Sequence, residues 1–165
     1  MIVFDSSTLI LLAKVELLDA FLDDYKKVVM IPQEVNEECC SRKNSFDALL
    51  IRKRIEEKKI KTARIHNIEL CERFIKDFSI DRGEAEALVL FLEKKALLLA
   101  VDDKNAIKAC KILKIPFASA LTILVRLVAR GVIESDDARK KIDILAKYGR
   151  YKHTMIKEAR ERLNL

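Results

Sequence analysis

The stretch LLLAVDD at residues 97–103 is the most informative segment of this sequence. Its apolar run is too short for a helix and stops at two acidic residues, a pattern typical of a buried strand that feeds into a loop. Asp102 and Asp103 would therefore stand at the carboxyl end of that strand, where the next helix begins.

Similar short apolar runs occur on both sides of this segment and alternate with stretches of helical spacing. We predict strands at residues 2–4, 28–31, 60–65, 97–101 and 115–118. Strands that alternate with helices form βαβ units and hence a parallel sheet covered on both faces. From residue 121 the pattern is helical throughout. The expected fold is therefore a three-layer α/β/α domain with a central parallel sheet of about five strands and a helical C-terminal tail.

The bulk composition supports one domain over residues 1–165, with an α/β core at 1–118 and a helical C-terminal extension at 119–165. The formal net charge of +6 favours polyanionic partners, although a solvated surface explains it equally well. The four cysteines form no Cys-x-x-Cys pair, so we expect reduced thiols in the cytoplasm. Residues 1–5 have no basic leader pattern and the apolar runs are too short for a membrane span, so we expect a soluble protein without a signal peptide.

Acidic residues mark the ends of several predicted elements. Asp5 follows the first strand, and Asp102-Asp103 follows the fourth. In open parallel sheets, binding sites lie beyond the carboxyl ends of the strands. A single acid at a helix start is usually a cap, but clustered carboxylates need a cation or a raised pKa. Their hard oxygen atoms select Mg²⁺ or Mn²⁺, and such a site suits phosphodiester hydrolysis.

Four motifs in order along the chain resemble those of PIN domains. Residues 4–10 (FDSSTLI) resemble the opening strand with its first acid, and residues 31–38 (IPQEVNEE) resemble the second motif. Residues 83–88 (GEAEAL) are similar to the third motif of a prokaryotic subgroup, and residues 101–106 (VDDKNA) to the fourth. The resemblance covers residues 1 to about 118 and extends to the helical tail.

This resemblance implies an endoribonuclease that hydrolyses single-stranded RNA with Mg²⁺ or Mn²⁺. The implied catalytic acids are Asp5, Glu38, Glu84 and Asp103. The implied metal ligands are Asp5, Glu84, Asp102 and Asp103, where Glu86 stays an alternative to Glu84 and the choice between Asp102 and Asp103 stays open. Candidate substrate contacts are Ser7, Glu86, Lys104 and Asn105. Many relatives are toxins with a protein antitoxin and many form homodimers, so both partners are expected here.

One departure from the subgroup motivates a second hypothesis. The subgroup usually has a glycine-rich turn beginning Gly-Thr after the fifth strand, whereas residues 118–122 here read ASALT. A loop with less backbone freedom leaves open a non-catalytic nucleic-acid-binding module on the same fold. A third reading is a receiver domain or an aspartyl phosphotransferase. The phosphotransferase pattern requires a second aspartate two residues after the first, and this chain has Ser7 there.

Two basic regions flank these motifs, one at residues 52–64 and one in the helical tail from Lys147 to Arg162. A basic rim would attract RNA to an acidic site, and solvated helix faces are the plainer explanation. Tyr148 and Tyr151 lie within the second region, where they could stack on bases or pack the final helix.

Overall fold

The computed structural model describes residues 1–41 and 44–164, and these fold into the three layers that the sequence predicts. Five parallel strands form one sheet in the order β3-β2-β1-β4-β5. The strands are β1 (Ile2–Phe4), β2 (Val29–Pro32), β3 (Ile60–Ala63), β4 (Leu98–Ala100) and β5 (Phe117–Ala118). Because the order runs outward from β1 in both directions, the chain reverses its winding between the paired strands β1 and β4.

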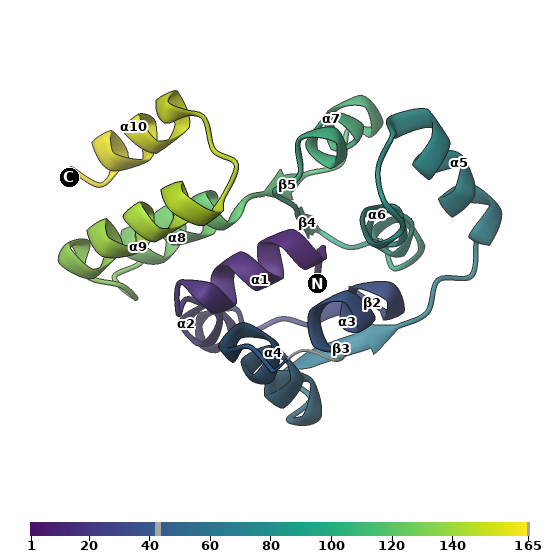
Figure 1. Ribbon diagram of the computed structural model, residues 1–165, viewed down its shortest axis with the longest axis horizontal. Helices are drawn as coiled ribbons and strands as arrows, with labels where there is room; N and C mark the ends of the chain where they lie inside the picture. The colour runs from purple at the N-terminus through teal and green to yellow at the C-terminus, as the bar shows by residue number, and fades with distance from the viewer. Residues whose placement is uncertain (42–43, 165) are drawn as a thin grey trace.

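The helices cover both faces of this sheet (Figure 1). They are α1 (Ser6–Lys14), α2 (Leu18–Asp24), α3 (Gln33–Cys40), α4 (Phe46–Glu56), α5 (Ile68–Phe78), α6 (Arg82–Glu93), α7 (Lys104–Leu113), α8 (Ala120–Ala129), α9 (Ser135–Tyr148) and α10 (His153–Arg162). One hydrophobic cluster joins one face of the sheet to α1, α2, α3, α4 and α8, and a second joins the other face to α5, α6 and α7.

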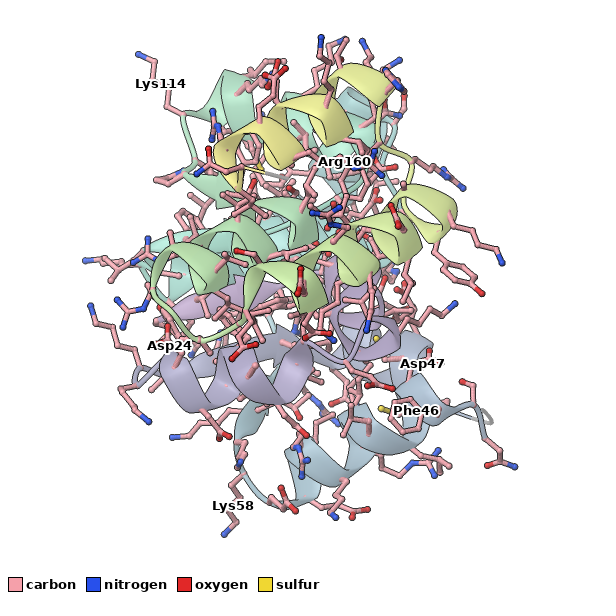
Figure 2. The ribbon with its side chains drawn as sticks, turned by 90° about the vertical axis from the view of Figure 1, so that its left-hand side faces the viewer. Asp24, Phe46, Asp47, Lys58, Lys114 and Arg160 are labelled. Carbon is pink, nitrogen blue, oxygen red and sulfur yellow. The ribbon has the colours of Figure 1, made fainter. Side chains whose placement is uncertain are left out.

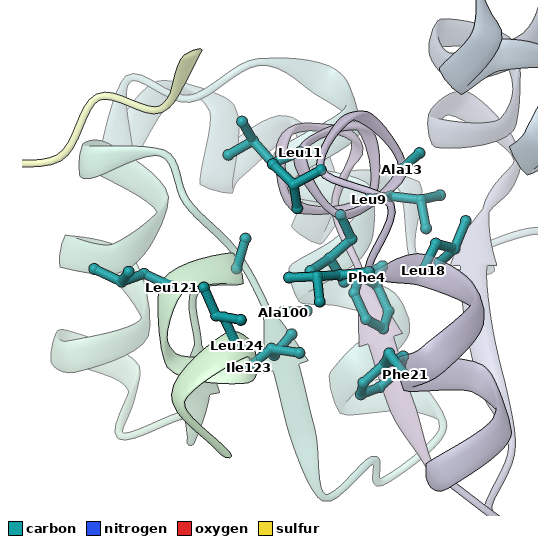
Figure 3. Packing of buried hydrophobic residues seen from close by; sticks show 14 of the residues in the cluster. Phe4, Leu9, Leu11, Ala13, Leu18, Phe21, Ala100, Leu121, Ile123 and Leu124 are labelled. Carbon is teal, nitrogen blue, oxygen red and sulfur yellow. The ribbon is translucent and has the colours of Figure 1, made fainter. Parts of the chain in front are cut away.

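Alternation along the strands explains this division. In β1, Ile2 and Phe4 point into the first cluster, whereas Val3 points into the second. The ring of Phe4 meets Phe21 of α2 edge-on, with centroids 5.4 Å apart. Figure 3 shows Phe4 and Ala100 between α1, α2 and α8. All residues of β1 are buried, as expected for a strand of a sheet that helices cover on both faces.

The C-terminal helices continue the first layer. α8 contacts α1 and α2, and α9 and α10 pack against α8 and each other. Figure 2 looks onto this side of the molecule, where Arg160 of α10 pairs with Asp143 of α9 at 2.5 Å. The apolar residues Leu121, Leu124 and Leu127 of α8 are buried in the core. Among the described residues, no helix is both long and apolar enough to cross a membrane.

Candidate metal-binding cleft

A cleft of about 350 Å³ opens beyond the carboxyl ends of β1 and β4. This is where the winding of the sheet reverses, and therefore where parallel α/β folds place their ligands. Its walls come from the start of α1, the start of α6, the loop before α7 and the segment after α9. A hollow of about 540 Å³ between α9 and α10 is more voluminous, but Glu161 is its one acidic lining residue.

Asp5 directly precedes Ser6 and Ser7, which line this cleft, and it is only 1% exposed. It ends β1 and caps α1, because its Oδ1 accepts a hydrogen bond from the Thr8 amide at 2.9 Å. The Ser7 hydroxyl donates to Asp5 Oδ2 at 2.7 Å. Burial raises the pKa of Asp5 to about 7, and the negative charge of Asp102 adds to that rise. The chain thus keeps a carboxyl group where ionisation is costly.

Glu84 faces the same cleft from the first turn of α6. It forms a capping box with Asp81: Glu84 Oε2 accepts from the Asp81 amide at 3.0 Å, and Asp81 Oδ1 accepts from the Glu84 amide at 2.8 Å. Burial raises the pKa of Glu84 to about 8, and the charges of Asp81, Asp103 and Asp5 raise it further. Glu84, Asp5 and Asp103 therefore lie in one shared electrostatic field.

The two acids after β4 have different environments. Asp103 caps α7, and its Oδ1 accepts from the Asn105 amide at 2.7 Å and the Ala106 amide at 3.1 Å. Asp102 holds other segments together, because its Oδ2 accepts from the Ala120 amide at 2.9 Å and its Oδ1 accepts from the Tyr151 hydroxyl. Within the described residues, Asp103 Oδ2 accepts no hydrogen bond, so it has the greater capacity for a further ligand.

The Thr8 hydroxyl is a buried polar group without a hydrogen-bond partner among the residues that the structure describes. It lies beside both Asp5 and Asp102, since it lowers the pKa of each, but it is not aligned for a hydrogen bond with either carboxylate. An unsatisfied oxygen between two acids is unusual in a folded interior. A bound cation or its water would satisfy it.

Glu38 reaches the same end of the molecule from α3. A Cβ atom on Gly83 would stand 2.5 Å from Glu38 Oε1, so the Glu38 carboxylate lies against Gly83 in the first turn of α6. Gly83 is required here because of this close approach, not because of its backbone angle. The second and third motifs thus meet in space at Gly83, and the role of Glu38 as a catalytic acid stays a prediction.

We predict that Gly83→Ala lowers the free energy of unfolding by about 1–2 kcal/mol, as overpacking does. The added methyl group has to displace the Glu38 carboxylate, and this outweighs the better helix propensity of alanine, which favours the variant by about 1 kcal/mol. Urea denaturation would measure the change. In a Glu38→Ala background the same substitution should become neutral or stabilising; equal destabilisation in both backgrounds would disprove the contact.

The structure does not bring every predicted residue into the cleft. The Glu86 carboxylate is buried and accepts from the Glu34 amide at 3.3 Å, on the side of α3. Lys104 is exposed at the start of α7, and Asn105 Nδ2 donates to the Ser79 carbonyl at 3.0 Å, which ties α7 to the end of α5. Ser7 does line the cleft. Of the alternatives left open, Glu84 and not Glu86 faces the other acids.

The ASALT stretch forms an ordinary helix start. Ser119 has φ −91°, and its hydroxyl accepts from the Thr122 amide at 3.1 Å. No left-handed residue occurs at this position, so the chain does not require glycine there. The serine cap also directs the Ala120 amide to Asp102. The departure from the subgroup therefore leaves the helix start and its backbone hydrogen bond to Asp102 intact.

Tyr151 is the site residue that sequence reasoning missed. Its hydroxyl donates to Asp102 from the linker between α9 and α10, where the sequence favoured simple packing of the final helix. The neighbouring Gly149 offered a signal, because a Cβ there would collide with the Tyr151 ring and lie 2.8 Å from the Leu145 carbonyl. A glycine after a helix is commonly just a cap, so the sequence alone did not reveal this constraint.

We predict that Tyr151→Phe destabilises the protein by about 1–3 kcal/mol, because Asp102 stays buried and loses a donor. Thermal and urea unfolding would measure this loss. The matched control is Tyr148→Phe, which removes the hydroxyl from a side chain that is 54% exposed and should change stability by less than about 0.5 kcal/mol. In a double-mutant cycle with Asp102→Ala, which removes the acceptor, the effects of the two changes should not be additive. Additive effects would show that this hydrogen bond is not the cause.

The donor chemistry of the cleft fits a hard divalent cation. Its acids are oxygen ligands, burial and mutual repulsion raise their pKa values, and Thr8 adds an unsatisfied hydroxyl. In the part of the chain that the structure describes, no three His, Cys, Asp or Glu side chains are grouped closely enough to hold a metal as they stand. Their oxygen atoms instead satisfy amides and hydroxyls of the elements they cap.

Fold and site together define a class: a parallel α/β protein with an acidic cleft where the sheet reverses its winding. A family model described as a PIN domain matches residues 1–164. The chain therefore belongs to the PIN-domain family. Its members are typically nucleases, which places it among the hydrolases at a coarse level. No curated protein and no solved structure matched the chain.

Proposed function

We propose that this protein is a metal-dependent endoribonuclease that hydrolyses phosphodiester bonds of single-stranded RNA in the acidic cleft. The observation that carries the proposal is the shared field of Asp5, Glu84 and Asp103, in which burial and neighbouring charge raise the pKa of Asp5 to about 7 and that of Glu84 to about 8. Such an arrangement is costly to ionise unless a cation compensates it. Mg²⁺ or Mn²⁺ suits its oxygen ligands.

A divalent cation bound there would neutralise negative charge and would lower the pKa of a water molecule, which is the chemistry that phosphodiester hydrolysis needs. The residues of the chain hold it and set its surroundings. Asp5, Glu84 Oε1 and Asp103 Oδ2 are the proposed ligands, and Ser7 fixes the Asp5 carboxylate. Glu38 adds negative charge next to α6. Asp102 joins the start of α8 to the linker after α9, because it accepts from the Ala120 amide and the Tyr151 hydroxyl, so we assign it to positioning the loop that carries Asp103.

RNA as the substrate rests on the net charge of +6 and on family membership. A basic surface attracts a polyanion towards a cleft that is itself acidic. A toxin role with a protein antitoxin, and a homodimer, are further proposals that follow from the family. Light scattering of the purified chain would test the dimer.

The proposal is tested with labelled single-stranded RNA, the matching DNA and duplex RNA, each with Mg²⁺, Mn²⁺ or excess chelator. We expect cleavage within the single-stranded RNA, dependent on the cation. Glu84→Gln should reduce the rate by roughly 100-fold, in the range for loss of an electrostatic group at a reacting centre. Glu86→Gln, two residues along the same helix, should stay within about threefold of the parent, since its carboxylate faces α3.

Cleavage that persists in excess chelator, or equal losses in Glu84→Gln and Glu86→Gln, would contradict this assignment. Tight binding of RNA without turnover under every cation tested would instead favour the non-catalytic binding module. The observation that favours this second function is that Asp5, Glu84 and Asp103 all accept capping hydrogen bonds at helix starts. Such caps also serve a purely structural purpose.

A further inference from the structure

Part of the lining of the cleft is basic and aromatic. This part consists of Lys14 at the end of α1, Tyr148 at the end of α9, and Gly149 and Arg150 directly after it. The same cleft therefore presents both acids and cations. A phosphodiester held at the acids would leave its neighbouring nucleotide facing this basic part of the lining.

The cations of this basic part of the lining are not neutralised within the protein. Lys14, Lys147 and Arg150 are exposed, and none forms a salt bridge with any acid among residues 1–41 and 44–164. Other arginines of the chain are paired, such as Arg54 with Asp19 at 2.5 Å. Unpaired cations beside a cleft remain free to bind phosphate.

Tyr148 presents its ring to solvent. The side chain is 54% exposed, so packing of the last helices does not account for its position. Lys14 Nζ lies 5.2 Å from the ring centroid, and Lys147 Nζ lies 5.4 Å from it. At an exposed site each such contact contributes only about 0.5–1 kcal/mol, so an arriving base can displace a lysine from the ring.

The distance between this ring and the acids is limited by the chain. Tyr151, three residues after Tyr148, donates its hydroxyl to Asp102. Three residues span at most about 11 Å when fully extended, so the backbone that carries Tyr148 stays close to the loop that carries Asp103. Gly149 allows the turn between them, because a side chain there would collide with the Tyr151 ring.

We propose that Tyr148, Lys14, Lys147 and Arg150 form a nucleotide-binding subsite next to the acids. It takes one unpaired base on the Tyr148 ring and the adjoining phosphate on the three cations. A base inside a duplex has its faces covered by its neighbours, so this subsite selects single strands. The inference rests on the proposed function in one respect, namely that the scissile phosphate lies at the carboxylates.

The test is binding of a short single-stranded RNA that carries the fluorescent base 2-aminopurine, in excess chelator so that nothing is cleaved. For the full chain we expect the fluorescence to be quenched by stacking. Tyr148→Phe should keep the quenching, and Tyr148→Ala should lose it with a Kd about tenfold higher, within the range known for one base stacked on one ring. Circular dichroism confirms that each variant is folded.

The cations are tested through salt. Lys14→Gln and Arg150→Gln should each lower the slope of log K against log salt by about 0.7, the value for one phosphate contact of a single strand. Lys111→Gln is the matched control, because this exposed lysine lies in the last turn of α7, at the end of that helix away from the cleft. Its slope should equal that of the parent.

Absence of quenching, equal quenching in Tyr148→Ala, or equal binding of duplex RNA would overturn the subsite. These results leave the nuclease assignment untouched, because the assay contains no divalent metal ion and measures no cleavage. Conversely, a protein that quenches as expected but never cleaves RNA with Mg²⁺ or Mn²⁺ would refute the proposed function and keep the subsite.

Discussion

Replacing Asp5 by asparagine should reduce cation-dependent RNA cleavage by at least 10²–10³-fold, roughly the cost of removing a charge-stabilising group from a reacting centre. Asp5 is the most deeply buried of the candidate ligands, and its environment is arranged so that its charge is costly without a cation. Asparagine keeps the shape and removes the charge. Cleavage rates of labelled single-stranded RNA at saturating Mn²⁺ measure the effect.

The fold should survive this change. Asparagine Oδ1 can still accept from the Thr8 amide, and the Ser7 hydroxyl can accept from the new amide group instead of donating. We therefore expect metal-free Asp5→Asn to be at least as stable as the parent at pH 7.5. A variant that retained activity within tenfold, while staying folded, would remove Asp5 from the site.

The second large effect is a loss of stability of the metal-free protein as the pH rises from about 4 to about 8. The pKa of Asp5 is raised from 3.8 to about 7 and that of Glu84 from 4.5 to about 8. Between these values the folded state binds more protons than the unfolded state, so the free energy of unfolding falls with rising pH. The full stability is present below about pH 4 and is lost as pH passes the folded-state pKa values.

Each unit of pKa shift corresponds to about 1.4 kcal/mol, so the raised pKa of Asp5 alone should lower the free energy of unfolding by a few kcal/mol across this pH range. Asp19 and Glu93 have lowered pKa values, so they make the folded state more stable as the pH rises. This gain is complete at about pH 5 and does not change between pH 5 and 8. Urea denaturation at a series of pH values in chelator would record the trend. A curve that is flat or rises between pH 5 and 8 would contradict it.

Cation binding should oppose the loss. Mn²⁺ at a hundred times its Kd adds about 2.7 kcal/mol to the free energy of unfolding. At a fixed Mn²⁺ concentration this stabilisation should be larger at pH 8 than at pH 5, because protons compete for the carboxylates at the lower pH. The double variant Asp5→Asn, Glu84→Gln is the control. It should show a shallower pH slope, because, of the carboxyl groups that the structure describes, only Glu86 and Asp102 then keep a pKa raised by burial, and it should show no response to Mn²⁺. A response that persists in that variant would point to a site elsewhere on the chain.

Much of the fold follows from the sequence because strand and helix periods are local properties. The run at residues 97–101 predicted a buried strand, and β4 lies there with β1 as its neighbour. The apolar spacing of residues 68–78 is helical, and α5 (Ile68–Phe78) lies there. Residues 9–13 and 15–22 also have helical spacing, and they correspond to α1 and α2, with a break at Glu16, which has φ 56°. The left-handed conformation of Glu16 itself is not visible in the periodicity.

The site was predictable only in part. Asp5 and Asp103 follow strands that turn out to be neighbours, so their proximity could be inferred from topology. The choice between Glu84 and Glu86 depended on the phase of α6, which the sequence left open and the packing of Glu86 against α3 decides. Tyr151 was missed because its role depends on the path of the linker after α9, a tertiary property that no local pattern encodes.

A crystal structure with Mn²⁺, located by its anomalous scattering, tests the central claim most directly. We predict one or two strong peaks in the cleft, within ordinary coordination distance of Asp5, Glu84 and Asp103 oxygen atoms, with Glu84 released from its capping hydrogen bond to Asp81. A fully folded protein at saturating Mn²⁺ that shows no peak there, or a peak bound by other residues, would contradict the claim that these acids surround a common cation.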